Sequence, residues 1–122
     1  MRRIQPGDRA LYIRMVQEFY RTDAVDHEIP VENIENTFEE LMRGDAYAEA
    51  YILEDQGQPA GYMLLAKTFS QEAGGPVVWI EEIYIRPEYQ GKGIGSRVFK
   101  KLDAMFDAGV YRLRLEVEKT NI

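Results

Sequence analysis

The chain has 122 residues, no cysteine and a formal net charge of −6. This length is typical of one domain, 1–122, that buries a core without disulfide or metal staples. The missing cysteines exclude a thiolate nucleophile, and a single histidine excludes a histidine-rich metal cluster, so we expect no metal. The acidic balance and the lack of an apolar run of about 18 residues predict a cytoplasmic protein without nucleic-acid or membrane partners.

Hydrophobic periodicity predicts alternating helices and strands along the chain. In chain order, the predicted elements are a strand at 2–5, helices at 8–20 and 31–42, strands at 47–54, 61–69 and 77–85, a helix at 94–105 that ends at Gly109, and a strand at 111–117. This β-α-α-β-β-β-α-β order predicts an α/β fold with a mostly antiparallel central sheet, helices on both faces and one crossover.

Local signals refine three of these elements. Asp8 is expected to cap the first helix, and residues 55–59 predict a hairpin with a longer loop. In the strand at 77–85, a regular pleat places Glu81, Ile83 and Ile85 on one face.

Charge is distributed unevenly along the chain. Residues 18–55 hold twelve acidic and two basic residues, a net charge of −10, whereas residues 86–101 hold five basic residues and one acidic residue, a net charge of +4. Both segments are consistent with solvated helix faces. The alternative is an anion site in the basic segment that faces an acidic wall.

A glycine-rich loop follows the strand at 77–85. Gly91, Gly93 and Gly95 lack side chains, so backbone N–H groups can approach a ligand closely, and the start of the next helix adds further unpaired N–H groups. With Lys92 and Arg97 at its edge, the loop favours a diphosphate. Its spacing matches neither the Walker A pattern nor the dinucleotide fingerprint. A tight turn without a ligand is the alternative.

The run Gln90-Gly91-Lys92-Gly93-Ile94-Gly95 resembles the Q/R-x-x-G-x-G/A acetyl-CoA loop of the GNAT superfamily of N-acetyltransferases. The preceding E-E-I-Y-I-R-P-E-Y resembles the fourth strand and turn of that family. The resemblance implies that loop amides hold the coenzyme A diphosphate and that the strand backbone pairs with the pantetheine arm like an added strand. The implied acetyl-CoA contacts are Ile83, Tyr84, Ile85, Gln90, Gly91, Lys92, Gly93, Ile94, Gly95, Ser96 and Asn121.

Acetyl transfer to an amine needs a base, a donor for the developing oxyanion and an acid for the thiolate. The resemblance implies the backbone N–H of Ile83 as the donor. Glu81 and Glu82 interrupt an apolar strand and are the candidate bases. We select Glu81, which shares the face of Ile83 in a regular pleat and matches the first acid of the L-E-D strand in polyamine-type members. A β-bulge would reverse this choice, and either glutamate could instead be solvated or salt-bridged.

No residue is assigned as the acid. The family's usual tyrosine follows the fifth strand in a pattern whose first residue matches Asn121, and the sequence ends at Ile122. We therefore expect a domain that is short at its C-terminus and truncated after the fifth strand.

The predicted function is acetyl transfer from acetyl-CoA to the primary amine of a small molecule or peptide by direct transfer. Two alternatives are a catalytically silent acyl-CoA-binding or regulatory domain, and a fragment completed by a second chain, for example in a homodimer. Four acids in the acidic segment could attract a cationic acceptor or merely keep the helices soluble. They are Asp23, Asp26, Glu28 and Glu32, and His27 beside them is expected to be a surface residue.

Overall fold

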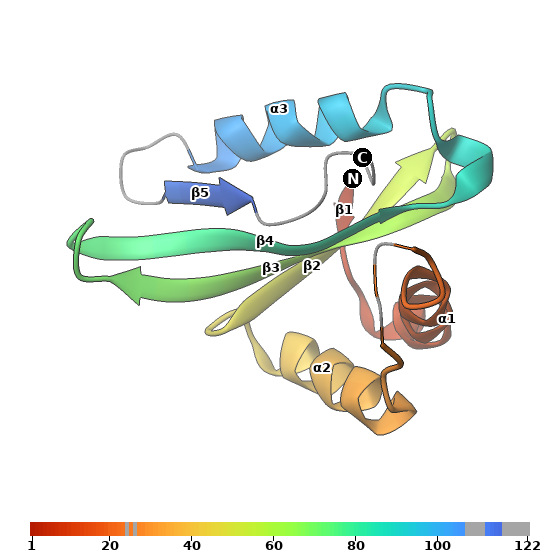
Figure 1. Ribbon diagram of the computed structural model, residues 1–122, viewed down its shortest axis with the longest axis horizontal. Coiled ribbons are helices and arrows are strands. Elements are labelled where there is room, and N and C mark those ends of the chain that lie inside the picture. The colour runs from red at the N-terminus through yellow and green to blue at the C-terminus, as the bar shows by residue number, and fades with distance from the viewer. Residues whose placement is uncertain (24, 26, 107–111, 116–122) are drawn as a thin grey trace.

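A five-stranded sheet separates two helical layers in the computed structural model, which describes residues 1–23, 25, 27–106 and 112–115 (Figure 1). The helices α1 and α2 cover one face and α3 covers the other. The elements are β1 (Arg2–Arg3), the 3₁₀ helix η1 (Pro6–Asp8), α1 (Arg9–Phe19), α2 (Val31–Arg43), β2 (Ala48–Asp55), β3 (Gln58–Ser70), β4 (Gly75–Ile85), the 3₁₀ helix η2 (Pro87–Tyr89), α3 (Ile94–Phe106) and β5 (Arg112–Leu115).

The sheet topology confirms the predicted fold class. The strands lie in the order β1-β2-β3-β4-β5, and neighbours are antiparallel except β4 and β5, which are parallel and connected through α3. Because β2, β3 and β4 are covered by helices on both faces, each reads as a nearly continuous apolar run. Residues 109, 111, 116, 117 and 121, which entered the sequence predictions, lie outside the described residues.

The predicted longer hairpin loop was wrong, whereas Asp8 is the N-cap residue of α1, as predicted. Only Gln56 and Gly57 separate β2 from β3, with φ angles of 50° and 79°, so the hairpin has a two-residue turn rather than a longer loop. This pair of positive φ angles matches the twist of the flanking strands. Asp8 occupies the N-cap position of α1, but its carboxylate accepts hydrogen bonds from the backbone N–H of Gln5 and from the guanidinium of Arg2.

A core of buried side chains lies on each face of the sheet. Tyr12 and Phe38 from the helices pack with Tyr62 of β3 on the α1 and α2 side. Val98 and Leu102 of α3 belong to the second core, with the alternate residues of the strands. This arrangement follows from the alternation of side chains along a strand.

A β-bulge in β4 interrupts this alternation. Leu64 of β3 lies opposite Glu82, whereas the next residue, Leu65, lies opposite Ile80, so Glu81 is an extra residue without a partner. The bulge places Ile83 on the α3 side of the sheet and Glu82 on the α1 side. The regular pleat predicted from the sequence, with Glu81 on the face of Ile83, was therefore wrong.

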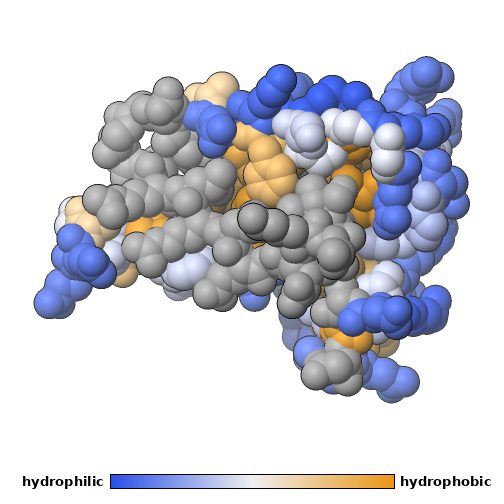
Figure 2. All heavy atoms as spheres, turned by 45° about the horizontal axis from the view of Figure 1, so that its top comes forward, coloured by the Kyte–Doolittle hydropathy of each residue, from blue (hydrophilic) through white to orange (hydrophobic). Residues whose placement is uncertain are grey.

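No helix in the part of the chain that the structure describes combines the length and the apolar character that crossing a bilayer requires. In Figure 2, hydrophilic residues line the rim of the molecule and hydrophobic patches lie between them.

Candidate active site

The described pairing of β4 with β5 stops at the bulge. On the β5 side, β4 is paired from Val77 to Ile80, where the partners run from Arg112 to Leu115. Beyond Ile80, β4 has no β5 partner among the described residues. In residues 81–85, the backbone N–H and C=O groups that face the β5 side are therefore not paired within the described sheet. This stretch of β4 leads toward the glycine-rich loop.

The loop has the backbone conformation that its glycines allow. Gly91 and Gly93 have φ angles of 78° and 80°, in the region that side chains disfavour. A Cβ added to Gly91 would meet no atom within 4 Å, and one added to Gly93 would meet only the Arg97 guanidinium at 3.9 Å. The outer side of the loop is thus open, and α3 begins at Ile94 with its first N–H groups unpaired within the helix. These features fit a diphosphate group.

Three predicted loop contacts have distinct environments. Gln90 donates a hydrogen bond from its side-chain amide to the carbonyl oxygen of Ile85 at 2.9 Å, so this side chain ties the loop to the end of β4. The side chain of Ile94 is buried in the core under α3, which leaves its backbone N–H as the group that can contact a ligand. Ser96 is exposed in the first turn of α3.

The basic residues of the loop face one carboxylate. Lys92 Nζ lies 4.0 Å and Arg97 Nη2 lies 3.9 Å from the carboxylate of Asp55 at the end of β2. The Lys92 ammonium also lies 5.3 Å from the ring centroid of Tyr89. Because the cationic side chains are more than half exposed, these pairs are weak, and both remain able to turn toward an anion.

Glu82 is held by two tyrosines. Its Oε2 accepts a hydrogen bond from Tyr20 Oη at 2.5 Å and its Oε1 accepts one from Tyr62 Oη at 2.7 Å. Burial raises the pKa of Glu82, and the two hydrogen bonds oppose this shift by stabilising the carboxylate. Burial and the nearby Glu82 carboxylate also raise the pKa of Tyr20, so the hydroxyl keeps its proton. A carboxylate with a raised pKa is a better proton acceptor than an exposed one.

Glu81 has a different environment from Glu82. Its side chain is exposed and lines an open cavity of about 450 Å³ on the surface of β3 and β4. The other lining residues are Ala66, Thr68, Trp79 and Ile80. The bulge therefore separates the two glutamates into one that is solvent-facing and one that is anchored by tyrosines.

A second polar network fixes the end of β4 to α1. Glu18 accepts hydrogen bonds from Tyr84 Oη at 3.0 Å and from two nitrogens of Arg86 at 3.0 and 3.1 Å. Arg86 also donates to the carbonyl oxygen of Pro59 at 3.2 Å. The network holds the segment before the loop against both α1 and the start of β3.

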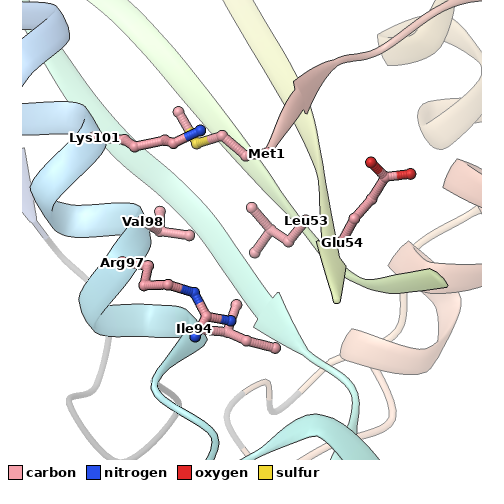
Figure 3. A pocket seen from close by; sticks show the side chains of 7 residues that line it. All are labelled: Met1, Leu53, Glu54, Ile94, Arg97, Val98 and Lys101. Carbon is pink, nitrogen blue, oxygen red and sulfur yellow. The ribbon is translucent and has the colours of Figure 1, made fainter. Parts of the chain in front are cut away.

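A further pocket, of about 190 Å³, lies between α3 and β2 (Figure 3). Leu53 and Val98 contribute apolar side chains, while Arg97 and Lys101 extend from α3 across its opening. Because it lies on the β2 side of α3, this pocket is separate from the edge between β4 and β5.

The acidic segment contributes exposed charged side chains, and one of them, Glu28, lines a cavity together with Tyr20. Asp23, Glu28, Glu32 and His27 are exposed, and the His27 ring contacts the Tyr20 ring with their centroids 5.7 Å apart. Asp26 lies outside the described residues.

The sequence reasoning missed the tyrosines around Glu82. Tyr20 and Tyr62 lie in segments that the sequence analysis interpreted only as a helix and a strand. A buried tyrosine hydroxyl needs a hydrogen-bond partner, and this requirement was the available signal.

The model of the acetyltransferase (GNAT) family matches residues 12–122. The chain belongs to this family. A thialysine N-epsilon-acetyltransferase from Bos taurus is 30% identical over 131 residues, which cover 96% of this chain and 73% of that protein. The enzyme of the same name from Mus musculus is 25% identical over 134 residues, with the same coverage of 96% and 73%.

Solved structures share the fold. A predicted acetyltransferase from Clostridium acetobutylicum, determined with acetyl-CoA, has a TM-score of 0.78 and 15% identity, covering 98% of this chain and 81% of that one. A ribosomal-protein-alanine N-acetyltransferase from Brucella melitensis has a TM-score of 0.75 and 15% identity, covering 96% and 78%. The family match and the named relatives identify the chain as an N-acetyltransferase and confirm the resemblance noted in the sequence.

Proposed function

We propose that this acetyltransferase moves the acetyl group of acetyl-CoA directly to a primary amine, with Glu82 as the base. The observation that carries the proposal is the bulge at Glu81, which orients the tyrosine-anchored Glu82 beside the stretch of β4 that lacks a described β5 partner. The structure with acetyl-CoA among the similar folds supports the choice of co-substrate.

In the proposed reaction, the open loop at Gly91 and Gly93 binds the diphosphate through backbone N–H groups, with Lys92 and Arg97 adding positive charge. The backbone of Ile83, Tyr84 and Ile85 pairs with the pantetheine arm. The bound co-substrate supplies an activated acetyl thioester. The Ile83 N–H donates to the carbonyl oxygen as negative charge develops there.

Glu82 accepts a proton from the acceptor ammonium, because a neutral amine is the nucleophile that the thioester requires. Its raised pKa suits this role, and Tyr20 and Tyr62 hold both carboxylate oxygens in place. The exposed Glu81 is the alternative base, acting through water. The sequence alone favoured Glu81 as the base, and the bulge is the reason that we propose Glu82 instead.

The acceptor class follows from the acidic segment and the relatives. Exposed Asp23, Glu28 and Glu32 favour a cationic acceptor, and the curated relatives are named for thialysine. The acceptor panel therefore includes thialysine, lysine, a polyamine and a lysine-containing peptide.

A cytoplasmic location, a single domain and a homodimer remain predictions. Sedimentation would test the homodimer.

The experiment measures thiol release from acetyl-CoA with this panel, beside the thermal shift caused by acetyl-CoA. We expect both signals in the wild type. Thermal stabilisation without thiol release for any amine would instead support the silent acyl-CoA-binding alternative. Absence of both would overturn the proposed function.

Variants assign the parts of the site. Gly93→Asp should abolish the acetyl-CoA thermal shift, because it places a negative charge where the diphosphate binds. Gly74→Asp is the matched control, since Gly74 also has a positive φ of 68° but lies in the turn at the opposite end of β4. Equal thermal shifts in both variants would remove the loop as the coenzyme site.

The two glutamates are compared in the same assay. Glu82→Gln should lower kcat by about a hundredfold or more, the usual contribution of a general base, with acetyl-CoA binding intact. Glu81→Gln should have a smaller effect. The reverse order would make Glu81 the base.

A further inference from the structure

Two tyrosines donate to Glu82, but their access to water differs. Tyr62 lies in β3 with its side chain fully buried, 0% exposed, between the sheet and the helices. Tyr20 follows the last residue of α1 and is partly exposed. Both make the same kind of hydrogen bond to the same carboxylate, at 2.7 and 2.5 Å. Glu82 is itself partly exposed, and of its two tyrosine partners only Tyr20 adds a second connection toward solvent.

The connection leads to a pocket at the end of α1. Tyr20 lines a cavity of about 170 Å³ together with Gln17, Arg21, Glu28 and Ile29. Arg21 and Glu28, which line it, are exposed. This cavity is distinct from the one beside Glu81, whose lining residues all come from β3 and β4.

Proton balance shows why such a route matters. An acceptor ammonium carries three protons, and the amide product keeps one. One of the remaining two ends on the thiol of coenzyme A, and the other must leave the site in every turnover. When the acceptor and the thioester occupy the β4 edge, they cover the direct approach of water to Glu82 from that side. The proton on Glu82 then needs another route to water.

We propose that Tyr20 passes this proton from Glu82 to water in the pocket at the end of α1, which rests on the proposed function. The Tyr20 hydroxyl donates its own proton to water and accepts the proton from Glu82, so that no net charge forms on the tyrosine. The exchange returns Glu82 to the carboxylate before the next acceptor binds. Tyr20 acts through Glu82 and does not touch the reacting atoms, so it is a positioning and relay residue rather than a catalytic one.

A second feature keeps this exchange neutral. Burial, followed by the hydrogen bond to Glu82, raises the pKa of Tyr20 above its ordinary value of 10.0. A tyrosinate is therefore disfavoured, and Tyr20 can move a proton only by exchanging one for another. For the same reason, Tyr20 is a poor acid toward a thiolate.

Tyr20→Phe and Tyr62→Phe form a matched pair for testing the relay. Each removes one hydroxyl that donates to Glu82, so each should raise the pKa of Glu82 and move the acid limb of the kcat profile to higher pH. A purely structural role for both tyrosines predicts no further difference. The relay predicts that Tyr20→Phe alone also lowers the plateau of kcat at high pH, by about tenfold. Tyr62→Phe removes a hydrogen bond that holds Glu82, and it should lower the plateau less than Tyr20→Phe does.

Buffer rescue gives the readout that a structural role would not move. A tertiary-amine buffer such as MOPS cannot form a stable amide, and it can carry a proton from Glu82 when Tyr20 is absent. Raising its concentration at constant pH and ionic strength should restore kcat of Tyr20→Phe and leave wild type and Tyr62→Phe unchanged. Thermal melts and the acetyl-CoA thermal shift confirm that all three proteins are folded and bind the co-substrate.

The outcomes separate the relay from the function on which it rests. If the wild type releases thiol and Tyr20→Phe has the wild-type plateau without buffer dependence, the relay is overturned and the acetyltransferase proposal stands. If both tyrosine variants lose the plateau equally, the relay is likewise overturned, because the buried Tyr62 has no route to water. If the wild type releases no thiol with any amine of the panel, the proposed function itself fails.

Discussion

Gly61 of β3 faces the backbone of β4 with no side chain between them, and its replacement by alanine tests how closely the two strands must approach. A Cβ built on Gly61 lies 1.9 Å from the carbonyl oxygen of Tyr84, 2.9 Å from its carbonyl carbon and 3.0 Å from Cα of Ile85. All three are backbone atoms, so no side chain can rotate away. An ordinary carbon–oxygen contact of about 3.3 Å requires the strands to separate locally by more than 1 Å.

This separation sets the expected loss of stability. The neighbouring hydrogen bond from the Arg86 N–H to the Ala60 carbonyl oxygen is 2.8 Å long, and an added 1 Å takes it beyond hydrogen-bonding distance. Losing this bond and one neighbour costs about 2 kcal/mol. Local overpacking of a tight core adds about 1–3 kcal/mol. We therefore expect Gly61→Ala to lower the free energy of unfolding by about 3–5 kcal/mol.

Urea denaturation followed by far-UV circular dichroism measures this loss. Gly7→Ala is the control, because a Cβ at Gly7 meets no atom within 4 Å and the residue has no positive φ. The control should stay within about 0.5 kcal/mol of wild type. A similarly small change for Gly61→Ala would refute the close approach of β3 and β4 at this point.

Three further predictions concern charged groups. Burial raises the pKa of Glu82 above 4.5, so its contribution to the free energy of unfolding falls as pH rises from 4.5 through the folded pKa. Glu82→Gln should therefore melt higher than wild type at pH 7, and the gap should close as the pH falls through the folded pKa toward 4.5. The Arg2 guanidinium lowers the pKa of Asp8 below 3.8, so Asp8→Asn should lower the free energy of unfolding by about 1–2 kcal/mol at pH 7. The loss should become smaller as acid protonates the wild-type carboxyl, which thermal melts at several pH values would measure. Glu18→Gln should lower the free energy of unfolding by about 1–2 kcal/mol. In a double-mutant cycle with Arg86→Ala, measured by urea denaturation, the two losses should be non-additive, and additive losses would contradict the network.

Much of the fold was readable from local sequence. The helix predicted at 31–42 is observed at Val31–Arg43 and is followed by Gly44, because apolar spacing and a glycine that stops a helix are both local signals. The glycine-rich loop was also predictable, since the positive φ angles of Gly91 and Gly93 are conformations that glycine adopts most readily. The two-residue β2–β3 turn was mispredicted, because strand length is decided by pairing between strands.

The same distinction between local sequence and tertiary structure applies to the candidate site. The sequence by itself determined that two adjacent glutamates interrupt an apolar strand just before a glycine-rich loop, because residue order and glycine conformation are local properties. Only the tertiary structure decided which glutamate lies on which face, because the bulge depends on the register between β3 and β4. It also decided the partners of Glu82. Tyr20 lies 62 residues away in the chain and reaches the carboxylate only when α1 packs on the sheet, whereas Tyr62, 20 residues away, reaches it through the pairing of β3 with β4.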